Sequence, residues 1–243
     1  MTDRQWLCAY VITRNGPCDY GLDPAPWLIG HGDLGIVVSE IEPEVFEQID
    51  PTDPADGGLV RLARRHDEVV RAVFRQAPVL PLRFGTVLAG TDAAVRLLRR
   101  SYDQALPCLA QIEGHREWGV RARLAGASQA RDDLTGLSGT EYLTLRRERL
   151  TSARRSRQSA AEAVGLLHTA LRRHATRTAE RARAHGVLAD TAYLVCQDQE
   201  SLFHREIDRL TGALDGSGVR LETTGPWPPY TFADIELGRR ADV

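Results

Sequence analysis

The distribution of apolar residues along the chain predicts strands that alternate with helices. Residues 6–13 form a nearly continuous apolar run, which is typical of a buried β-strand. A second apolar run at 35–41, centred on Ile36, Val37 and Val38, predicts another strand. The residues between the two runs are rich in Gly and Pro, which favour loops over regular structure. The chain therefore opens with two strands joined by a loop.

The next part of the chain has a helical pattern interrupted by one strand. Apolar side chains recur at helical spacing over 59–76 with charged residues between them, which predicts an amphipathic helix. Residues 79–84 are typical of a short strand, and Pro81 within it favours a position at the edge of a sheet. Two further stretches, 93–98 and 102–112, have helical spacing and complete this part of the chain.

The second half predicts strands and helices in alternation. Apolar and charged residues alternate over 117–124, which is typical of a strand with one charged face. A long helix is expected from about 140 to 185. The chain closes with a strand at 191–196, a helix at 200–214 and a strand at 219–224.

This order of elements predicts an α+β fold of two domains. We expect the boundary near Gly114, with an N-terminal α+β domain of residues 1–114 and a C-terminal domain of residues 115–243. The alternation of strands and helices in the second domain favours a ferredoxin-like arrangement. Its long helix, about 140–185, contains Gly165 as the single internal breaker, which leaves open an interruption there.

The composition is that of an ordinary folded protein. Of its 243 residues, 42% are hydrophobic and 26% charged, which excludes wholesale disorder. No long uninterrupted apolar run and no secretory signal are found, so we expect a cytoplasmic protein that is not bound to a lipid membrane. The net charge of -2 gives no global attraction to nucleic acid. The cysteines are far apart and are expected to be free thiols: Cys8, Cys18, Cys108 and Cys196.

Several segments, taken in order, carry a resemblance to a known family. The most distinctive is PVLPLRFGTVL at 78–88, a proline-flanked apolar run that ends in Arg-Phe-Gly and leads into a helix. The others are WLCAYVITR, HGDLGIVVSEIE, RRHDEVVRAVF, GHREWGVRARL, SGTEYLTLRRE, TAYLV and GPWPPYTF. Over roughly residues 5–235 the chain resembles the gas vesicle GvpL/GvpF family. The sequence does not separate the F-like branch of that family from the L-like branch.

The resemblance implies a non-enzymatic accessory or minor structural protein of gas vesicle formation, located in the cytoplasm and associated with the gas vesicle. The implied partners are the shell protein GvpA and other gas vesicle accessory proteins, with no cofactor and no small-molecule substrate. Two other classes stay open. One is a nucleic-acid-binding protein that uses the Arg-rich first half of the long helix, although acidic residues share that helix and no aromatic residues interleave with the arginines. The other is a two-domain enzyme.

Arg83, Phe84 and Gly85, at the end of the predicted strand 79–84, form the first group of candidate site residues. The Arg83 guanidinium could pair with a carboxylate such as Glu117 across the domain boundary, or it could present its donors to a partner. We favour the structural pairing. Glu117 and its neighbour Trp118 are therefore candidates as well.

The GPWPPY segment forms the second group, with Trp227, Pro228, Pro229 and Tyr230 as candidates. Its prolines preset an extended path of low conformational entropy, and its two aromatic rings offer large apolar faces. Such a segment can dock a partner or lock the carboxy terminus onto the second domain. We favour the locking role.

No catalytic, cofactor or metal site is expected. The seven histidines are scattered, and His168 and His174, which lie on one predicted helix, are six residues apart, the wrong spacing for one helix face. The sequence contains no GxSxG nucleophile elbow, and its glycines match neither a phosphate-binding loop nor a dinucleotide fingerprint.

Overall fold

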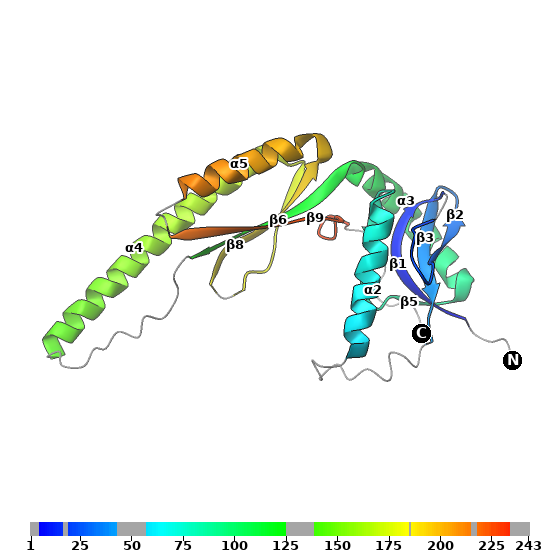
Figure 1. Ribbon diagram of the computed structural model, residues 1–243, viewed down its shortest axis with the longest axis horizontal. Helices are drawn as coiled ribbons and strands as arrows, with labels where there is room; N and C mark the ends of the chain where they lie inside the picture. Colours follow the sequence, from blue (N-terminus) through cyan, green and yellow to red (C-terminus); the bar gives the residue numbers. More distant parts are fainter. Residues whose placement is uncertain are drawn as a thin grey trace. The chain divides into compact units, whose positions relative to one another are not determined.

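The chain folds into two compact units, each with its own antiparallel sheet pairing (Figure 1). The computed structural model describes residues 5–16, 19–42, 57–124, 139–184, 186–214 and 218–233. Unit 1 comprises Met1–Arg116 together with Trp227–Val243, and unit 2 comprises Glu117–Pro226. The mixed helix and sheet class predicted from the sequence is confirmed.

Unit 1 is built on a five-stranded sheet in the order β2-β3-β1-β4, with β5 also paired to β1. The strands are β1 (Trp6–Arg14), β2 (Trp27–His31), β3 (Leu34–Glu40), β4 (Val79–Pro81) and β5 (Val87–Ala89). All of these pairs are antiparallel. Every residue of β1 from Leu7 to Thr13 is buried, so both faces of the sheet are covered. This explains the continuous apolar run in the sequence.

Two helices cover the faces of this sheet (Figure 1). Helix α2 (Gly57–Phe74) buries Val69, Val70 and Val73, which share a core with Tyr10 of β1 and with residues of β3 and β4. Helix α3 (Gly90–Ile112) also packs on the sheet. The sequence predicted two helical pieces here, but α3 is one helix with Pro107 inside it.

Unit 2 has a four-stranded sheet in the order β7-β8-β6-β9. Its elements follow the chain as β6 (His115–Leu124), α4 (Gly139–Leu171), β7 (Arg177–Glu180), β8 (Val187–Cys196), α5 (Glu200–Ala213) and β9 (Val219–Trp227). The helices share one core with the sheet, to which α4 contributes Leu167 and Leu171, and α5 contributes Phe203 and Ile207. Figure 1 shows α4 and α5 side by side along this sheet.

The prediction of a helix running to residue 185 is wrong, because α4 ends at Leu171. A single 3₁₀ turn, Arg172–His174, follows, and Ala175 then takes an extended conformation with φ of -119° and ψ of 140°. The chain continues as β7, an edge strand that pairs with β8. Helix propensity over 172–185 is therefore overridden by backbone pairing with a strand that comes later in the chain.

The assignment of all residues after 115 to one C-terminal domain also differs from the structure. At Trp227 the chain returns to unit 1, so that unit contains both ends of the sequence. The reason lies in the side chains of the returning segment, because Phe232 is 1% exposed and its carbonyl accepts a hydrogen bond from Cys108 Sγ of α3 at 3.8 Å.

Candidate functional site

Arg83, Phe84 and Gly85 form an insertion in one strand of the unit 1 sheet. Strands β4 and β5 both pair with β1 and together make an interrupted strand. Val11 pairs with Pro81 and Cys8 pairs with Val87, so three steps along β1 correspond to six steps along its partner. The partner strand therefore carries three extra residues. An insertion of this kind pushes backbone out of the ladder and re-aims the side chains on it.

The inserted residues are held in a tight turn. The Arg83 carbonyl accepts hydrogen bonds from Thr86 N at 3.1 Å and from Thr86 Oγ1 at 2.7 Å. Gly85 has a φ of 82°, which a residue with a Cβ rarely adopts. On either side of the turn, Leu82 N donates to Tyr10 O and Ala9 N donates to Thr86 O, both within 2.9 Å. The turn is thus fixed to β1 at both ends.

The turn places the Phe84 ring over His66 of α2. The two ring centroids are 5.7 Å apart with an interplanar angle of 83°, an edge-to-face contact. The His66 ring also contacts the ring of Tyr10, at a centroid distance of 5.5 Å. His66 is 6% exposed, whereas Phe84 is 41% exposed. The outer ring of this stack therefore faces solvent and the inner one does not.

Burial governs the ionisation of the groups beneath the turn. It lowers the pKa of His66, an effect opposed in part by a hydrogen bond to the Leu82 backbone and by the charge of Asp67. Burial also raises the pKa of Tyr10 to about 12, although the Tyr10 hydroxyl is within 2.6 Å of Ser39 Oγ. His66 Nδ1 is buried and has no hydrogen-bond partner among the residues that the structure describes. The imidazole is therefore neutral near pH 7, with one polar atom whose bonding capacity is unused.

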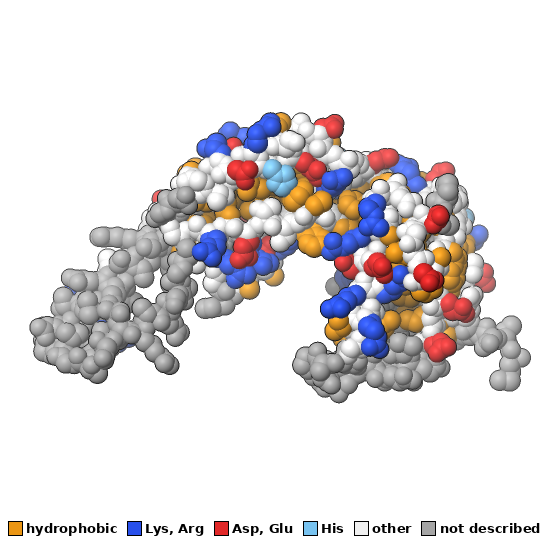
Figure 2. All heavy atoms as spheres, viewed as in Figure 1, with side chains coloured by type: hydrophobic (Ala, Val, Ile, Leu, Met, Phe, Trp, Pro, Cys, Tyr) orange, Lys and Arg blue, Asp and Glu red, His pale blue; other side chains and the backbone are white. Residues whose placement is uncertain are grey.

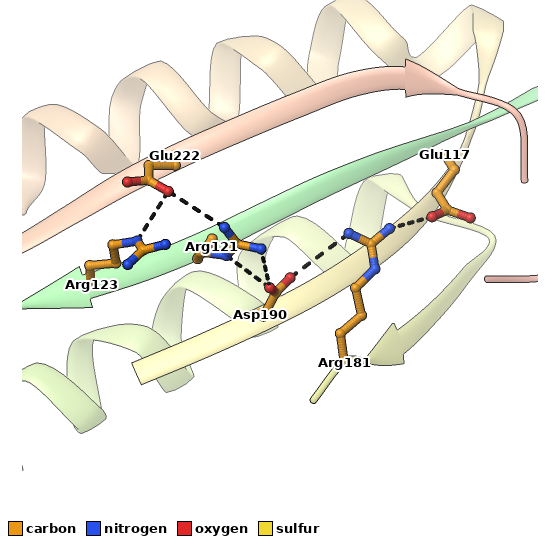
Figure 3. Close-up of polar contacts among 6 residues, drawn as sticks. All are labelled: Glu117, Arg121, Arg123, Arg181, Asp190 and Glu222. Carbon is orange, nitrogen blue, oxygen red and sulfur yellow. Dashed lines mark hydrogen bonds and ion pairs between the residues drawn. The ribbon is translucent and has the colours of Figure 1, made fainter. Parts of the chain in front are cut away.

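Glu117 belongs to a row of ion pairs that crosses the unit 2 sheet (Figure 3). The carboxylate that we expected to pair with Arg83 pairs instead with Arg181 of its own unit. The Arg181 guanidinium also lies 3.9 Å from Asp190. Arg121 binds Asp190 at 2.7 Å. Glu222 lies 3.9 Å from Arg121 and 3.1 Å from Arg123, which completes the row.

The row is neutral and depends on a glycine. Its three arginines face three carboxylates, so it leaves no net charge for a partner (Figure 3). A Cβ on Gly119 would lie 2.9 Å from a terminal nitrogen of Arg181 and 2.7 Å from Thr224 Oγ1. Gly119 therefore provides the space that Arg181 needs to reach Glu117. This arrangement has the character of a structural network.

Trp118 points to the opposite face of β6, into the unit 2 core. Its Nε1 donates to Glu200 Oε1 at 3.1 Å, and its ring meets that of His204 edge-to-face at 4.3 Å. With 9% of its surface exposed, Trp118 is a core residue whose polar atom is satisfied.

The GPWPPY segment packs on helix α2 of unit 1, not on the second unit as we had expected. The Arg71 guanidinium lies 4.2 Å from the centroid of the Trp227 ring, a cation–π contact. The Tyr230 hydroxyl donates to Asp67 Oδ1 at 3.1 Å, and Asp67 also pairs with Arg71 at 2.6 Å. Pro228 and Pro229 are buried. These contacts attach the returning segment to α2.

Two of the residues that matter most were missed by sequence reasoning. His66 was dismissed as an isolated histidine, because nothing local reveals that Phe84 lies above it. Arg181 was assigned to the long helix. A signal for it was present, since an isolated glycine inside a strand pattern, here Gly119, often marks the close approach of another group.

Among the described residues there is no group of three or more His, Cys, Asp or Glu side chains arranged to hold a metal ion. None of the helices in the described part of the chain is long and apolar enough to span a bilayer.

Comparison with known proteins identifies the family. The sequence profile described as gas vesicle synthesis protein GvpL/GvpF matches residues 9–234. The chain is 34% identical to gas vesicle protein L of Streptomyces sp. (strain CB03234), covering 93% of this chain and 92% of that protein. It is 27% identical to gas vesicle protein F2 of Halobacterium salinarum, covering 87% and 82%.

The fold is shared with a solved structure. The crystal structure of GvpF from Anabaena sp. PCC7120 matches with a TM-score of 0.73 at 18% identity, and the match covers 98% of this chain and all of that one. The chain therefore belongs to the GvpL/GvpF family of gas vesicle synthesis proteins.

Proposed function

We propose that this chain is an accessory or minor structural protein of gas vesicle formation, which binds the shell protein GvpA, other gas vesicle accessory proteins, or both during assembly. The observation that carries the proposal is the family match over residues 9–234, together with the similarity to gas vesicle proteins L and F2 over most of their length. The role is one of binding and not of catalysis. It takes place in the cytoplasm, at the growing gas vesicle.

The proposal includes a two-domain chain whose second domain is ferredoxin-like. The succession β6, α4, β7, β8, α5, β9 and the sheet order β7-β8-β6-β9 support this assignment, because a β-α-β-β-α-β unit is the ferredoxin-like pattern. A boundary close to Gly114 is supported by the division of the chain, because the first segment of unit 1 ends at Arg116 and unit 2 begins at Glu117.

The candidate residues take different roles in this proposal. Arg83 and Phe84, presented by the turn at Gly85, bind the partner. Glu117 and Trp118 stabilise the second domain through Arg181 and Glu200. The segment of Trp227, Pro228, Pro229 and Tyr230 holds the carboxy-terminal part of the chain on α2.

Co-expression with gas vesicle proteins tests the proposed function. The tagged chain is produced together with GvpA or with one accessory protein at a time, and the purified material is washed in moderate salt. We expect at least one of these proteins to be retained at a fixed ratio. A tag attached to an unrelated α+β protein of similar size serves as the control.

Retention of GvpA would make the chain a direct partner of the shell, and retention of accessory proteins alone would make it an assembly scaffold. Retention of none of them, in a preparation that is folded, would contradict the proposed function. A parallel measurement of DNA binding at low salt checks the Arg-rich helix, since phosphate contacts would produce strong binding that falls steeply with added salt.

A further inference from the structure

The three-residue insertion in the edge strand of unit 1 places an aromatic ring where the fold does not require one. Closing the sheet needs only that β4 and β5 continue their pairing with β1, which a strand without the insertion would provide. The inserted Phe84 instead leaves the sheet and is 41% exposed above α2. An exposed aromatic side chain on a rigid turn is typical of a residue that anchors a partner.

A second observation at the same place is the unused hydrogen-bonding capacity of His66. Its Nδ1 is buried and has no partner in the described part of the chain, the side chain is 6% exposed, and the Phe84 ring meets the imidazole edge-to-face. Native proteins leave few buried polar atoms unsatisfied, so such an atom calls for a specific explanation. A donor from outside the chain that reached His66 beside the Phe84 ring would satisfy this atom.

The side chains around Phe84 give this surface a definite chemistry. On helix α2 the residues one turn before His66 on the same helix face are the half-buried Leu62 and the exposed Ala63. Figure 2 shows hydrophobic side chains beside charged ones of both signs in the region of α2. Arg83, beside Phe84 in the turn, is exposed, and within the described part of the chain no carboxylate forms an ion pair with it.

We propose that the surface formed by Leu62, Ala63, Arg83 and Phe84, with His66 beneath it, docks an apolar peptide segment that carries a carboxylate and a hydrogen-bond donor. We call this surface the Phe84 patch. The apolar part of the segment packs on Phe84 and α2, the carboxylate binds the Arg83 guanidinium, and an N–H or O–H group donates to His66 Nδ1. The proposal rests on the proposed function, because it takes the partner to be a gas vesicle protein.

Charge decides the kind of partner. The exposed Arg83 guanidinium beside the exposed Phe84 ring favours a segment that carries a carboxylate, because complementary charge steers the encounter and fixes the orientation of the complex. The Arg83 guanidinium presents several donors in one plane and so can bind a carboxylate through two hydrogen bonds. The arginines of the ion-pair row in unit 2 do not offer such a binding site, because carboxylates of the same row already neutralise them.

Variants of the full-length chain test the Phe84 patch with GvpA and with each accessory protein, co-expressed one at a time. The variants are Phe84→Ala, Arg83→Glu and His66→Phe, of which the last keeps a ring between Tyr10 and Phe84 but removes Nδ1. The matched control is Trp27→Ala, because Trp27 is 36% exposed on β2 of the same unit. Circular dichroism and thermal unfolding establish that each variant is folded.

We expect Phe84→Ala and Arg83→Glu each to weaken binding of the retained protein about tenfold or more, as loss of an anchor residue does. His66→Phe should weaken it about fivefold or more, the net effect of one lost hydrogen bond. Trp27→Ala should bind as the wild type does. Wild-type affinity should fall with added salt, and more steeply than that of Arg83→Glu.

The outcomes separate this proposal from the proposed function. If the wild type retains a gas vesicle protein and folded Phe84→Ala and Arg83→Glu retain it equally well, the Phe84 patch is not the docking site. The binding role assigned above to Arg83 and Phe84 then fails with it, while the proposed role of the chain in gas vesicle formation stands. If Arg83→Glu retains the partner and Phe84→Ala does not, the partner segment is not acidic, which overturns the proposed carboxylate contact. Unchanged binding by His66→Phe would overturn the proposed hydrogen bond to His66 Nδ1. If the wild type retains no gas vesicle protein, both proposals fail.

Discussion

Removing Arg181 should destabilise the protein much more than removing the charge of its ion-pair partner Glu117. The Glu117 side chain is 1% exposed, whereas that of Arg181 is 30% exposed. Replacing Arg181 by Met leaves a buried carboxylate without its guanidinium, and breaking a buried pair in this way costs about 3–5 kcal/mol. Because Arg181 is partly hydrated, we place the expected loss at the lower end, about 3 kcal/mol.

The converse substitution should cost less. Glu117→Gln leaves a guanidinium that is partly in water and still 3.9 Å from Asp190, so the expected loss is about 1 kcal/mol, as for a single hydrogen bond. Arg183→Met is the matched control. Its pair with Glu180 is exposed on both sides, 56% and 76%, and such pairs contribute about 0–1 kcal/mol.

Hydrogen exchange measured by mass spectrometry is the suitable assay, because it reports the opening free energy of β6 and β8 separately from unit 1. The expected order of destabilisation is Arg181→Met, then Glu117→Gln, then Arg183→Met. Equal effects of Arg181→Met and Arg183→Met, or a larger effect of Glu117→Gln than of Arg181→Met, would refute the argument from burial.

Three further predictions concern unit 1. Gly85→Ala should lower the stability of unit 1 by about 1–2 kcal/mol, seen as a lower urea midpoint. The reason is the φ of 82°, since an added Cβ would have no atom of the described residues within 4 Å. Trp227→Ala should speed hydrogen exchange in α2 and leave α5 unchanged, because the ring contacts Arg71. The pKa of His66 in the folded protein lies below its unfolded value of about 6.5. The free energy of unfolding should therefore be highest above pH 6.5 and should fall as the pH drops through the folded pKa. His66→Phe should flatten this dependence in urea titrations from pH 7.5 to 5, and an unchanged slope would contradict the assignment.

The elements with a strong pattern were predictable from the sequence. The prediction of a strand at 6–13 closely matches β1, because burial on both faces requires an unbroken apolar run. The helices at 59–76 and 200–214 likewise match α2 and α5, since each buries one apolar stripe and exposes the rest. The local sequence pattern is sufficient to predict an element when its buried residues recur with the period of a helix or a strand, or when the whole strand is buried.

Other elements depend on contacts that are distant in the sequence. Strand β2, Trp27–His31, was missed because it contains Gly30 and shows no clear alternation, and its conformation comes from pairing with β3. Residues 79–84 were predicted as one strand, but the ladder breaks after Pro81 and resumes at Val87. The insertion is recognisable only from the register against β1, which no local pattern encodes.

The contacts of the candidate site residues were not predictable from the sequence. Sequence reasoning identified Arg83, Phe84 and Gly85, and expected Glu117 as the carboxylate partner. The Glu117 carboxylate pairs with Arg181, a residue 64 positions later, which had been assigned to a helix. An error in one secondary-structure element thus concealed the correct ion pair.

The central claim is that this chain acts in gas vesicle formation, and complementation tests it most directly. A gas vesicle gene cluster is expressed in a host that otherwise makes no gas vesicles, with this chain present or deleted, and vesicles are counted by electron microscopy. The account predicts that deletion abolishes or sharply reduces vesicles and that the chain supplied on a second plasmid restores them. Normal vesicle numbers after deletion, in a cluster with no other GvpL/GvpF member, would contradict it.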